Sequence, residues 1–176
     1  GGTGNMVNSH GSVVAGGLNN QVVGDTSVIV GGWFNTAEGS HSFVGGGRTN
    51  QAGGEYSTVA GGDSNFATGD TSTIAGGRFN GAWALGATVG GGISNTAQEK
   101  YSTIGGGYQN KAYADSTTVS GGVRNEAFGK RSTIGGGFGN ASSGDGSVVA
   151  GGFTNQTGGD YSVIAGGRSN NTIGTA

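Results

Sequence analysis

The chain lacks cysteine and proline altogether, and it has only one methionine, Met6, with eight basic and ten acidic residues among its 176. Without cysteine there is no disulfide to hold the fold together. The absence of proline and of a three-residue glycine period excludes a collagen triple helix. The formal net charge of −2 provides no polybasic surface for nucleic acid or anionic lipid. No apolar run in this segment is long enough to span a membrane, and the segment shows no charged-plus-apolar pattern of a signal peptide. We therefore expect no nucleic-acid partner and no membrane insertion by this segment.

What the chain does have is glycine, 44 residues of it, arranged in a strict fifteen-residue repeat. Counted from Ser12, eleven copies without insertion or deletion follow the pattern S-x-(V/I)-x-G-G-x-x-N-x-A-x-G-x-x over residues 12–176. Residues 1–11 match the later positions of a truncated copy. We interpret residues 1–176 as one continuous repeat segment excised from a longer fibre, because the end of a repeat array normally carries a cap. A flexible linker would not keep these residue types in phase.

Each copy divides into two similar halves, S-x-V-x-G and N-x-A-x-G. Alternation at period two predicts a short half-buried strand in each half, and the glycine that follows predicts a turn. The sequence therefore predicts an all-β parallel β-solenoid of about twelve coils, one per repeat. Positions one, three, nine and eleven are nearly invariant and are expected inside, whereas positions two, four, ten and twelve are expected outside.

Asparagine occupies position nine of every full copy, and a buried amide needs hydrogen-bond partners. Stacked identical asparagines can bond to their copies in neighbouring coils, so we interpret the column as a structural ladder. The ladder comprises Asn20, Asn35, Asn50, Asn65, Asn80, Asn95, Asn110, Asn125, Asn140, Asn155 and Asn170.

The predicted core is thin, because each coil offers it only one Val or Ile and usually one Ala. A second source of apolar burial is therefore expected at the corner after Gly-Gly, where large apolar residues recur. A corner of this kind favours packing against a neighbouring chain. The candidate interchain corner comprises Trp33, Phe79, Tyr108, Phe138 and Phe153.

Catalysis finds little support in the sequence. The only histidines, His10 and His41, lie two coils apart on turn positions, and neither an H-E-x-x-H nor a Walker A motif occurs. Acidic residues such as Asp25 and Asp70 recur at position fourteen, but Lys100 and Lys130 share that column, which is typical of a solvated turn. Calcium remains a minor alternative. We predict no enzyme activity, no catalytic residues, no metal and no cofactor.

The repeat resembles the head repeat of YadA-like trimeric autotransporter adhesins, and it is similar to Gly-Gly-Asn stretches of bacterial and phage tail-fibre-like surface proteins. The resemblance implies a left-handed parallel β-roll, a trimer and an extracellular location on a cell or virion surface. One departure is that the adhesin heads carry large apolar residues at positions two and four, whereas this chain carries mostly Thr or Val and Gly, Ala or Ser there.

Position two also resembles the flat Thr/Ser face of grass-type ice-binding β-rolls. Threonine fills it in six successive coils, which gives the candidate flat face Thr58, Thr73, Thr88, Thr103, Thr118 and Thr133. Threonine rows are also ordinary in β-sheets, so the face can equally be structural or packed.

These observations together predict a non-enzymatic extracellular fibre, stalk or adhesin-head segment that works as a homo-oligomer, expected to be a trimer. A cell-surface or glycan receptor is a possible partner. The alternative is an antifreeze β-roll that uses the threonine face.

Overall fold

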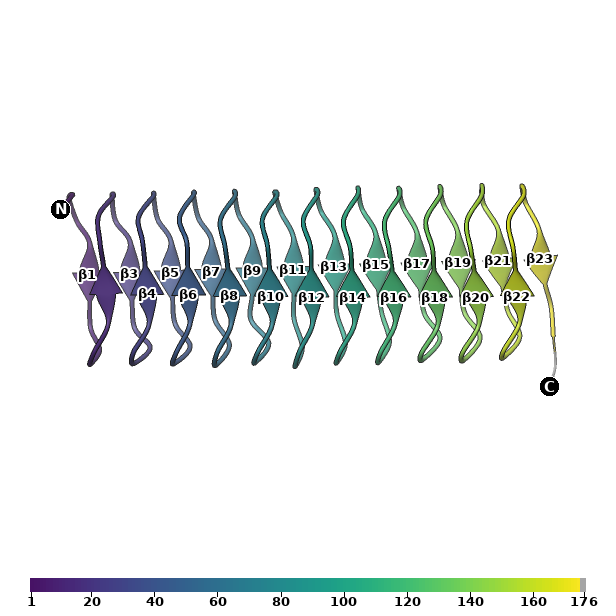
Figure 1. Ribbon diagram of the computed structural model, residues 1–176, viewed down its shortest axis with the longest axis horizontal. Coiled ribbons are helices and arrows are strands. Elements are labelled where there is room, and N and C mark those ends of the chain that lie inside the picture. Colours follow the sequence, from purple (N-terminus) through teal and green to yellow (C-terminus); the bar gives the residue numbers. More distant parts are fainter. Residues whose placement is uncertain (175–176) are drawn as a thin grey trace.

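The chain forms a parallel β-solenoid, and the computed structural model describes its residues 1–174, which contain no helix. Two long parallel sheets run along the axis, and each coil contributes one two-residue strand to each sheet (Figure 1). The prediction of an all-β solenoid with one coil per fifteen residues is confirmed.

The odd-numbered strands form the twelve-stranded sheet and cover positions ten and eleven of the repeat. They are β1 (Met6–Val7), β3 (Gln21–Val22), β5 (Thr36–Ala37), β7 (Gln51–Ala52), β9 (Phe66–Ala67), β11 (Gly81–Ala82), β13 (Thr96–Ala97), β15 (Lys111–Ala112), β17 (Glu126–Ala127), β19 (Ala141–Ser142), β21 (Gln156–Thr157) and β23 (Asn171–Thr172).

The even-numbered strands form the eleven-stranded sheet and cover positions two and three. They are β2 (Val13–Val14), β4 (Val28–Ile29), β6 (Phe43–Val44), β8 (Thr58–Val59), β10 (Thr73–Ile74), β12 (Thr88–Val89), β14 (Thr103–Ile104), β16 (Thr118–Val119), β18 (Thr133–Ile134), β20 (Val148–Val149) and β22 (Val163–Ile164).

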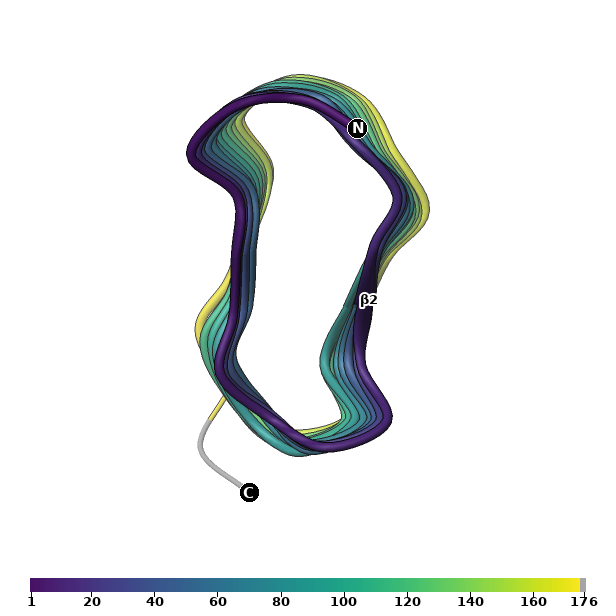
Figure 2. The ribbon, with the colours of Figure 1, turned by 90° about the vertical axis from the view of Figure 1, so that its left-hand side faces the viewer.

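Every strand pairs in register with the residues one repeat away, as Thr73 with Thr88 and Ala82 with Ala97. A third ladder of single bridges joins the position-seven residues of successive coils, from Thr3 with Leu18 to Phe153 with Arg168. In Figure 1 the chain descends the far side through β1 and rises on the near side through β2 as it advances, so the coil is left-handed. Viewed along the axis in Figure 2, the coils superpose closely, with a small progressive rotation.

The core is a narrow column of small apolar side chains. Val59 and Ile74 at position three are fully buried, as are Ala67 and Ala82 at position eleven. Their strand neighbours at positions two and ten are mostly partly or fully exposed. This split follows from the alternation of side chains along a strand, and it confirms the predicted inside and outside positions.

Non-glycine residues in the left-handed conformation turn the chain at two corners of the coil. Eighteen of them, at positions eight and fifteen, have φ between 52° and 60°. There the backbone N–H points back along the axis: Phe34 donates to the carbonyl of Leu18 at 3.0 Å, and Tyr56 donates to Ser40 at 2.9 Å. In the strands the N–H points forward instead, as from Thr58 to Ser72. These bonds between coils offset the cost of a conformation that L-residues rarely adopt.

Candidate functional surfaces

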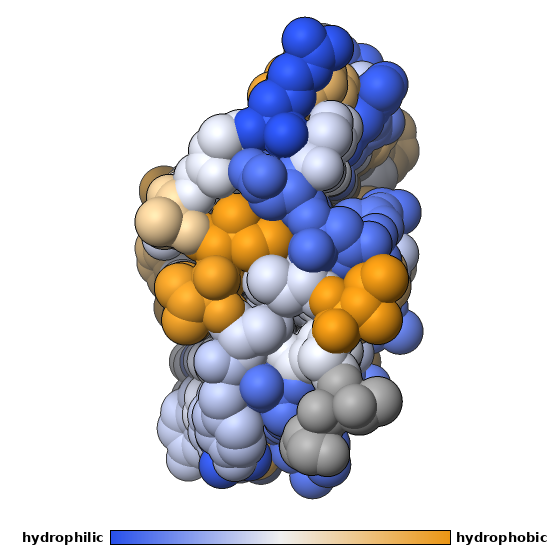
Figure 3. Space-filling model, turned by 90° about the vertical axis from the view of Figure 1, so that its right-hand side faces the viewer, coloured by the Kyte–Doolittle hydropathy of each residue, from blue (hydrophilic) through white to orange (hydrophobic). Residues whose placement is uncertain are grey.

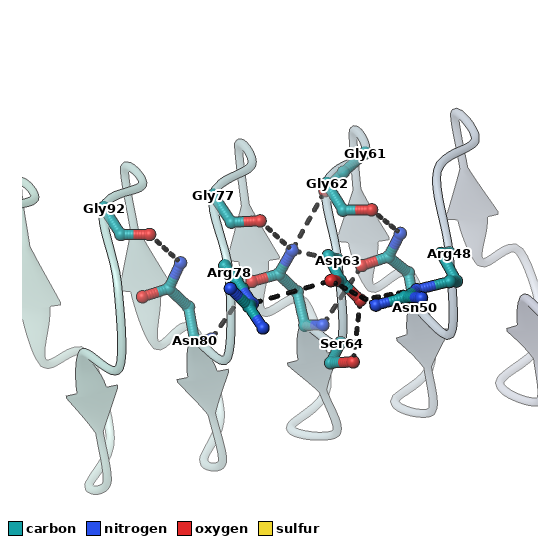
Figure 4. A network of polar contacts seen from close by, with 11 residues as sticks. Arg48, Asn50, Gly61, Gly62, Asp63, Ser64, Gly77, Arg78, Asn80 and Gly92 are labelled. Carbon is teal, nitrogen blue, oxygen red and sulfur yellow. Dashed lines mark hydrogen bonds and ion pairs between the residues drawn. The ribbon is translucent and has the colours of Figure 1, made fainter.

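The asparagine column lies inside the solenoid and holds the corner backbone together. Asn80 Nδ2 donates to the carbonyl oxygens of Gly76 at 3.0 Å and Gly92 at 2.9 Å, and its Oδ1 accepts the backbone N–H of Asn95 at 3.0 Å. Figure 4 shows the bond to Gly92 and the equivalent arrangement around Asn50. The amide therefore bonds mainly to backbone, and in only some coils also directly to its copy, as Asn65 does to Asn50 at 3.1 Å.

The second glycine of each Gly-Gly pair belongs to the same structural unit. Gly62 has φ +102°, and a Cβ there would lie 2.2 Å from the carbonyl oxygen of Gly77 and 2.6 Å from Asn65 Nδ2. A Cβ on Gly61, by contrast, would lie 3.9 Å from the nearest carbonyl oxygen, which is that of Gly46. The close approach that lets the asparagine reach the next coil therefore requires glycine at position six.

The acidic column at position fourteen has a structural role that the sequence did not indicate. Asp70 Oδ1 accepts the backbone N–H of Glu55 at 3.0 Å, and Asp145 Oδ1 accepts that of Lys130 at 2.9 Å. Each carboxylate thus bonds the preceding coil. Within residues 1–174 no group of three His, Cys, Asp or Glu side chains is placed to hold a metal ion.

The threonine face forms an in-register row on the outside of the eleven-stranded sheet. All six side chains from Thr58 to Thr133 are partly exposed. The row ends at Phe43 on one side and at Val148 on the other. Thr88 Oγ1 makes a 3.5 Å contact with the carbonyl of Gly86, and none of the other five hydroxyls has a hydrogen-bond partner in the part of the chain that the structure describes. The face thus presents regularly spaced methyl and hydroxyl groups.

The candidate corner after Gly-Gly spans two positions of the repeat. Four of its members, Trp33, Tyr108, Phe138 and Phe153, belong to the position-seven ladder, whereas Phe79 lies at position eight, where its ring packs under Arg78. We call the continuous part of the position-seven ladder the apolar strip: Ile93, Tyr108, Val123, Phe138 and Phe153.

The apolar strip is exposed, or at Val123 partly exposed, along five consecutive coils. Its four large side chains other than Val123 are between 39% and 45% exposed. The rings of Phe138 and Phe153 stack at 5.0 Å, and Arg168 lies over Phe153 at 5.3 Å from the ring centroid. The end-on view of Figure 3 shows apolar atoms on both long sides of the cross-section, among hydrophilic ones.

Toward the N-terminus, charge replaces the apolar residues of the same ladder. Asp63 accepts a bidentate pair of bonds from Arg48, at 2.8 and 3.2 Å, and lies 3.6 Å from Arg78 (Figure 4). The hydrogen bond from Arg48, with a further one from Ser64, holds the pKa of Asp63 below its ordinary value.

A polar groove opens beside the strip, between positions eight and ten of three successive coils. Its lining is Ser94, Gln109, Lys111, Arg124 and Glu126, and its volume is about 470 Å³. Lys111 Nζ pairs with Glu126 at 3.1 Å, and Arg124 Nε donates to Gln109 Oε1 at 3.0 Å. The pKa of Lys111 lies above its ordinary value because the ammonium interacts with Tyr113 and Glu126. Sequence reasoning missed this groove.

The two histidines do not meet. His41 stacks on Tyr56 at a centroid distance of 4.6 Å, whereas His10 lies near Asp25, with 3.9 Å between Nδ1 and the carboxylate. No described helix is long and apolar enough to cross a membrane.

Comparison with known families gives one match. The family described as Ubiquitous surface protein adhesin repeat matches residues 57–69, which are the first thirteen positions of one coil, from Ser57 through Asn65 to Gly69. No curated protein matches the chain. An adhesin repeat and a solenoid fold fit a structural or adhesive role at a surface and suggest a protein that is not an enzyme.

Proposed function

We propose that the chain is a non-enzymatic segment of an extracellular fibre or adhesin head that works as a homo-oligomer, a trimer. The observation that carries the proposal is the apolar strip from Ile93 to Phe153, which is exposed on a single chain. The match to an adhesin repeat supports the surface role, and the resemblance to trimeric adhesin heads supports the number of chains.

The geometry of the strip favours a second copy as its partner. Its five side chains are spaced by the sheet repeat of about 4.8 Å, so the strip is about 20 Å long. A surface with the same spacing can interdigitate with it along its whole length, and another solenoid has that spacing. Contiguous apolar patches on soluble proteins usually mark such contacts. The thin core gives a further reason for burial between chains.

The experiment is a measurement of mass in solution after the strip is made polar. The double variant Tyr108→Ser and Phe138→Ser removes two rings from the strip without touching the buried positions three and eleven, and we expect the oligomer to dissociate. Phe79→Ser is the matched control, because Phe79 is also about half exposed but lies outside the strip. An oligomer that survives the double variant would contradict this interface.

A second candidate function is ice binding by a monomer. The specific observation in its favour is the in-register row from Thr58 to Thr133, with hydroxyls that are largely free of partners within the described residues. If the face binds ice, replacing Thr88 and Thr103 by Tyr abolishes thermal hysteresis and leaves the fold and mass unchanged. If the face packs against another chain, the same pair weakens assembly by about 1–3 kcal/mol per site, since overpacking a fitted interface is unfavourable.

A further inference from the structure

The groove between positions eight and ten carries charged residues where the other coils carry uncharged ones. These two columns carry side chains outward on either side of the buried asparagine at position nine, and elsewhere they hold uncharged residues. All three charged residues of the two columns, Lys111, Arg124 and Glu126, line the groove. In a chain with so few charges, their convergence on one concavity sets this part of the surface apart.

The groups in the groove can still bond to a ligand. The side chains of Lys111 and Glu126 are 39% and 37% exposed although they pair with each other. Arg124 uses Nε to hold Gln109, and within residues 1–174 its two terminal nitrogens have no protein acceptor. A guanidinium fixed at Nε with a free outer edge is suited to bidentate recognition of a carboxylate. Gln109, Ser94 and Glu126 add neutral and anionic partners for hydroxyl groups.

A stacked aromatic pair adjoins the groove. Tyr113 and Phe128, at position twelve of the coils that supply Lys111 and Glu126, stack with their centroids 5.0 Å apart and their planes 15° apart. Lys111 Nζ lies 5.6 Å from the centroid of the Tyr113 ring, so it connects the aromatic pair to the polar lining. Phe128 is 44% exposed. The outer faces of such a stacked pair can pack against the C–H face of a sugar ring.

We propose that this groove binds an acidic oligosaccharide. Arg124 pairs with a sugar carboxylate, Gln109, Ser94 and Glu126 bond to ring hydroxyls, and the Tyr113–Phe128 pair packs against an adjacent ring. The three coils extend about 10 Å along the axis, which is about the length of a disaccharide. This proposal rests on the proposed surface role, and it adds the class of ligand that the surface would bind.

The test is a calorimetric titration of the whole chain with three probes: a hyaluronan hexasaccharide, neutral maltohexaose and hexaglutamate. We expect the hyaluronan fragment alone to bind. Arg124→Gln should weaken its affinity about tenfold or more, because a charge-assisted bond is lost. Arg131→Gln is the matched control, as an exposed arginine of the same coil at the opposite corner, and should change affinity less than twofold. Tyr113→Ala should weaken binding about fivefold, and Tyr113→Phe should retain it.

Equal binding of hexaglutamate, or equal losses in Arg124→Gln and Arg131→Gln, would show attraction by charge alone and overturn the proposal. Absence of hyaluronan binding would overturn it as well. That failure is separable from failure of the fibre proposal, because the mass of the unmodified chain is measured independently. An oligomer that binds no acidic sugar refutes the groove alone, and a monomer that binds it refutes the assembly alone.

Discussion

The side-chain oxygen of Asn80 accepts the backbone N–H of Asn95, one coil further along the axis, at 3.0 Å. The same relationship recurs from Asn5 and Asn20 to Asn155 and Asn170. Each amide also ties a carbonyl of its own coil to one of the next, so a single side chain joins two successive coils. The column therefore links successive coils at this corner, beside the backbone bonds of positions seven and eight.

Removing one amide should destabilise the fold strongly. Asn95→Ala leaves the carbonyl of Gly91 and the N–H of Asn110 without their partners, each of which is now at 2.9 Å. It also removes one of the two bonds to the Gly107 carbonyl, which keeps the N–H of Ile93. Because a buried unpaired group costs about 1–3 kcal/mol, we expect a loss of about 3 kcal/mol or more in the free energy of unfolding, measured by denaturant titration. Gln98→Ala, on the exposed face of the same coil, should change it by less than about 0.5 kcal/mol. Equal effects of the two variants would refute the role of the ladder.

The two glycines of a pair should respond differently to alanine. Gly62→Ala forces a side chain into φ +102° and against the carbonyl of Gly77, so we expect a destabilisation of more than about 3 kcal/mol or failure to fold. Gly61→Ala has open space and an ordinary φ, and should be neutral or stabilising by up to about 1 kcal/mol. Thermal melting of the pair measures this, and similar losses in both would contradict the argument.

The interior could be predicted from the sequence because strand alternation has a fixed period and the repeat has no insertions. Val59 and Ala67 are buried where that period places them. The hydrogen-bond partners of each asparagine could not be predicted from the sequence. They are glycine carbonyls that come close to the amide only because the backbone turns at the corner. The left-handed residues at position eight, such as Phe34 and Phe79, were missed because local propensity argues against them.

The groove was missed for another reason. Its signal in the sequence is the charge at positions eight and ten of two neighbouring coils, because these positions hold only uncharged residues in the other coils. Arg124 and Lys111 are thirteen residues apart, however, and only the stacking of one coil on the next brings them to the same groove.

Acid should weaken the fold in part through Asp63. Its pKa in the folded chain is depressed below the ordinary value of 3.8, so its stabilisation is present above about pH 4 and is lost as the pH falls through the folded value. Asp63→Asn should therefore flatten the fall in melting temperature between about pH 4 and pH 2 at low ionic strength. Salt should shrink the difference, because the pair is exposed. If the melting temperatures of the unmodified chain and of Asp63→Asn fall equally with pH at low salt, this origin of acid sensitivity is contradicted.

The most direct test of the account is the mass of the unmodified chain in solution, measured by light scattering over a range of concentrations. The account predicts three times the 17.0 kDa of a single chain, with the Tyr108→Ser and Phe138→Ser double variant falling to one. A stable mass of one chain at every concentration, with the apolar strip in water and thermal hysteresis in the same sample, would contradict the fibre and favour the ice-binding alternative.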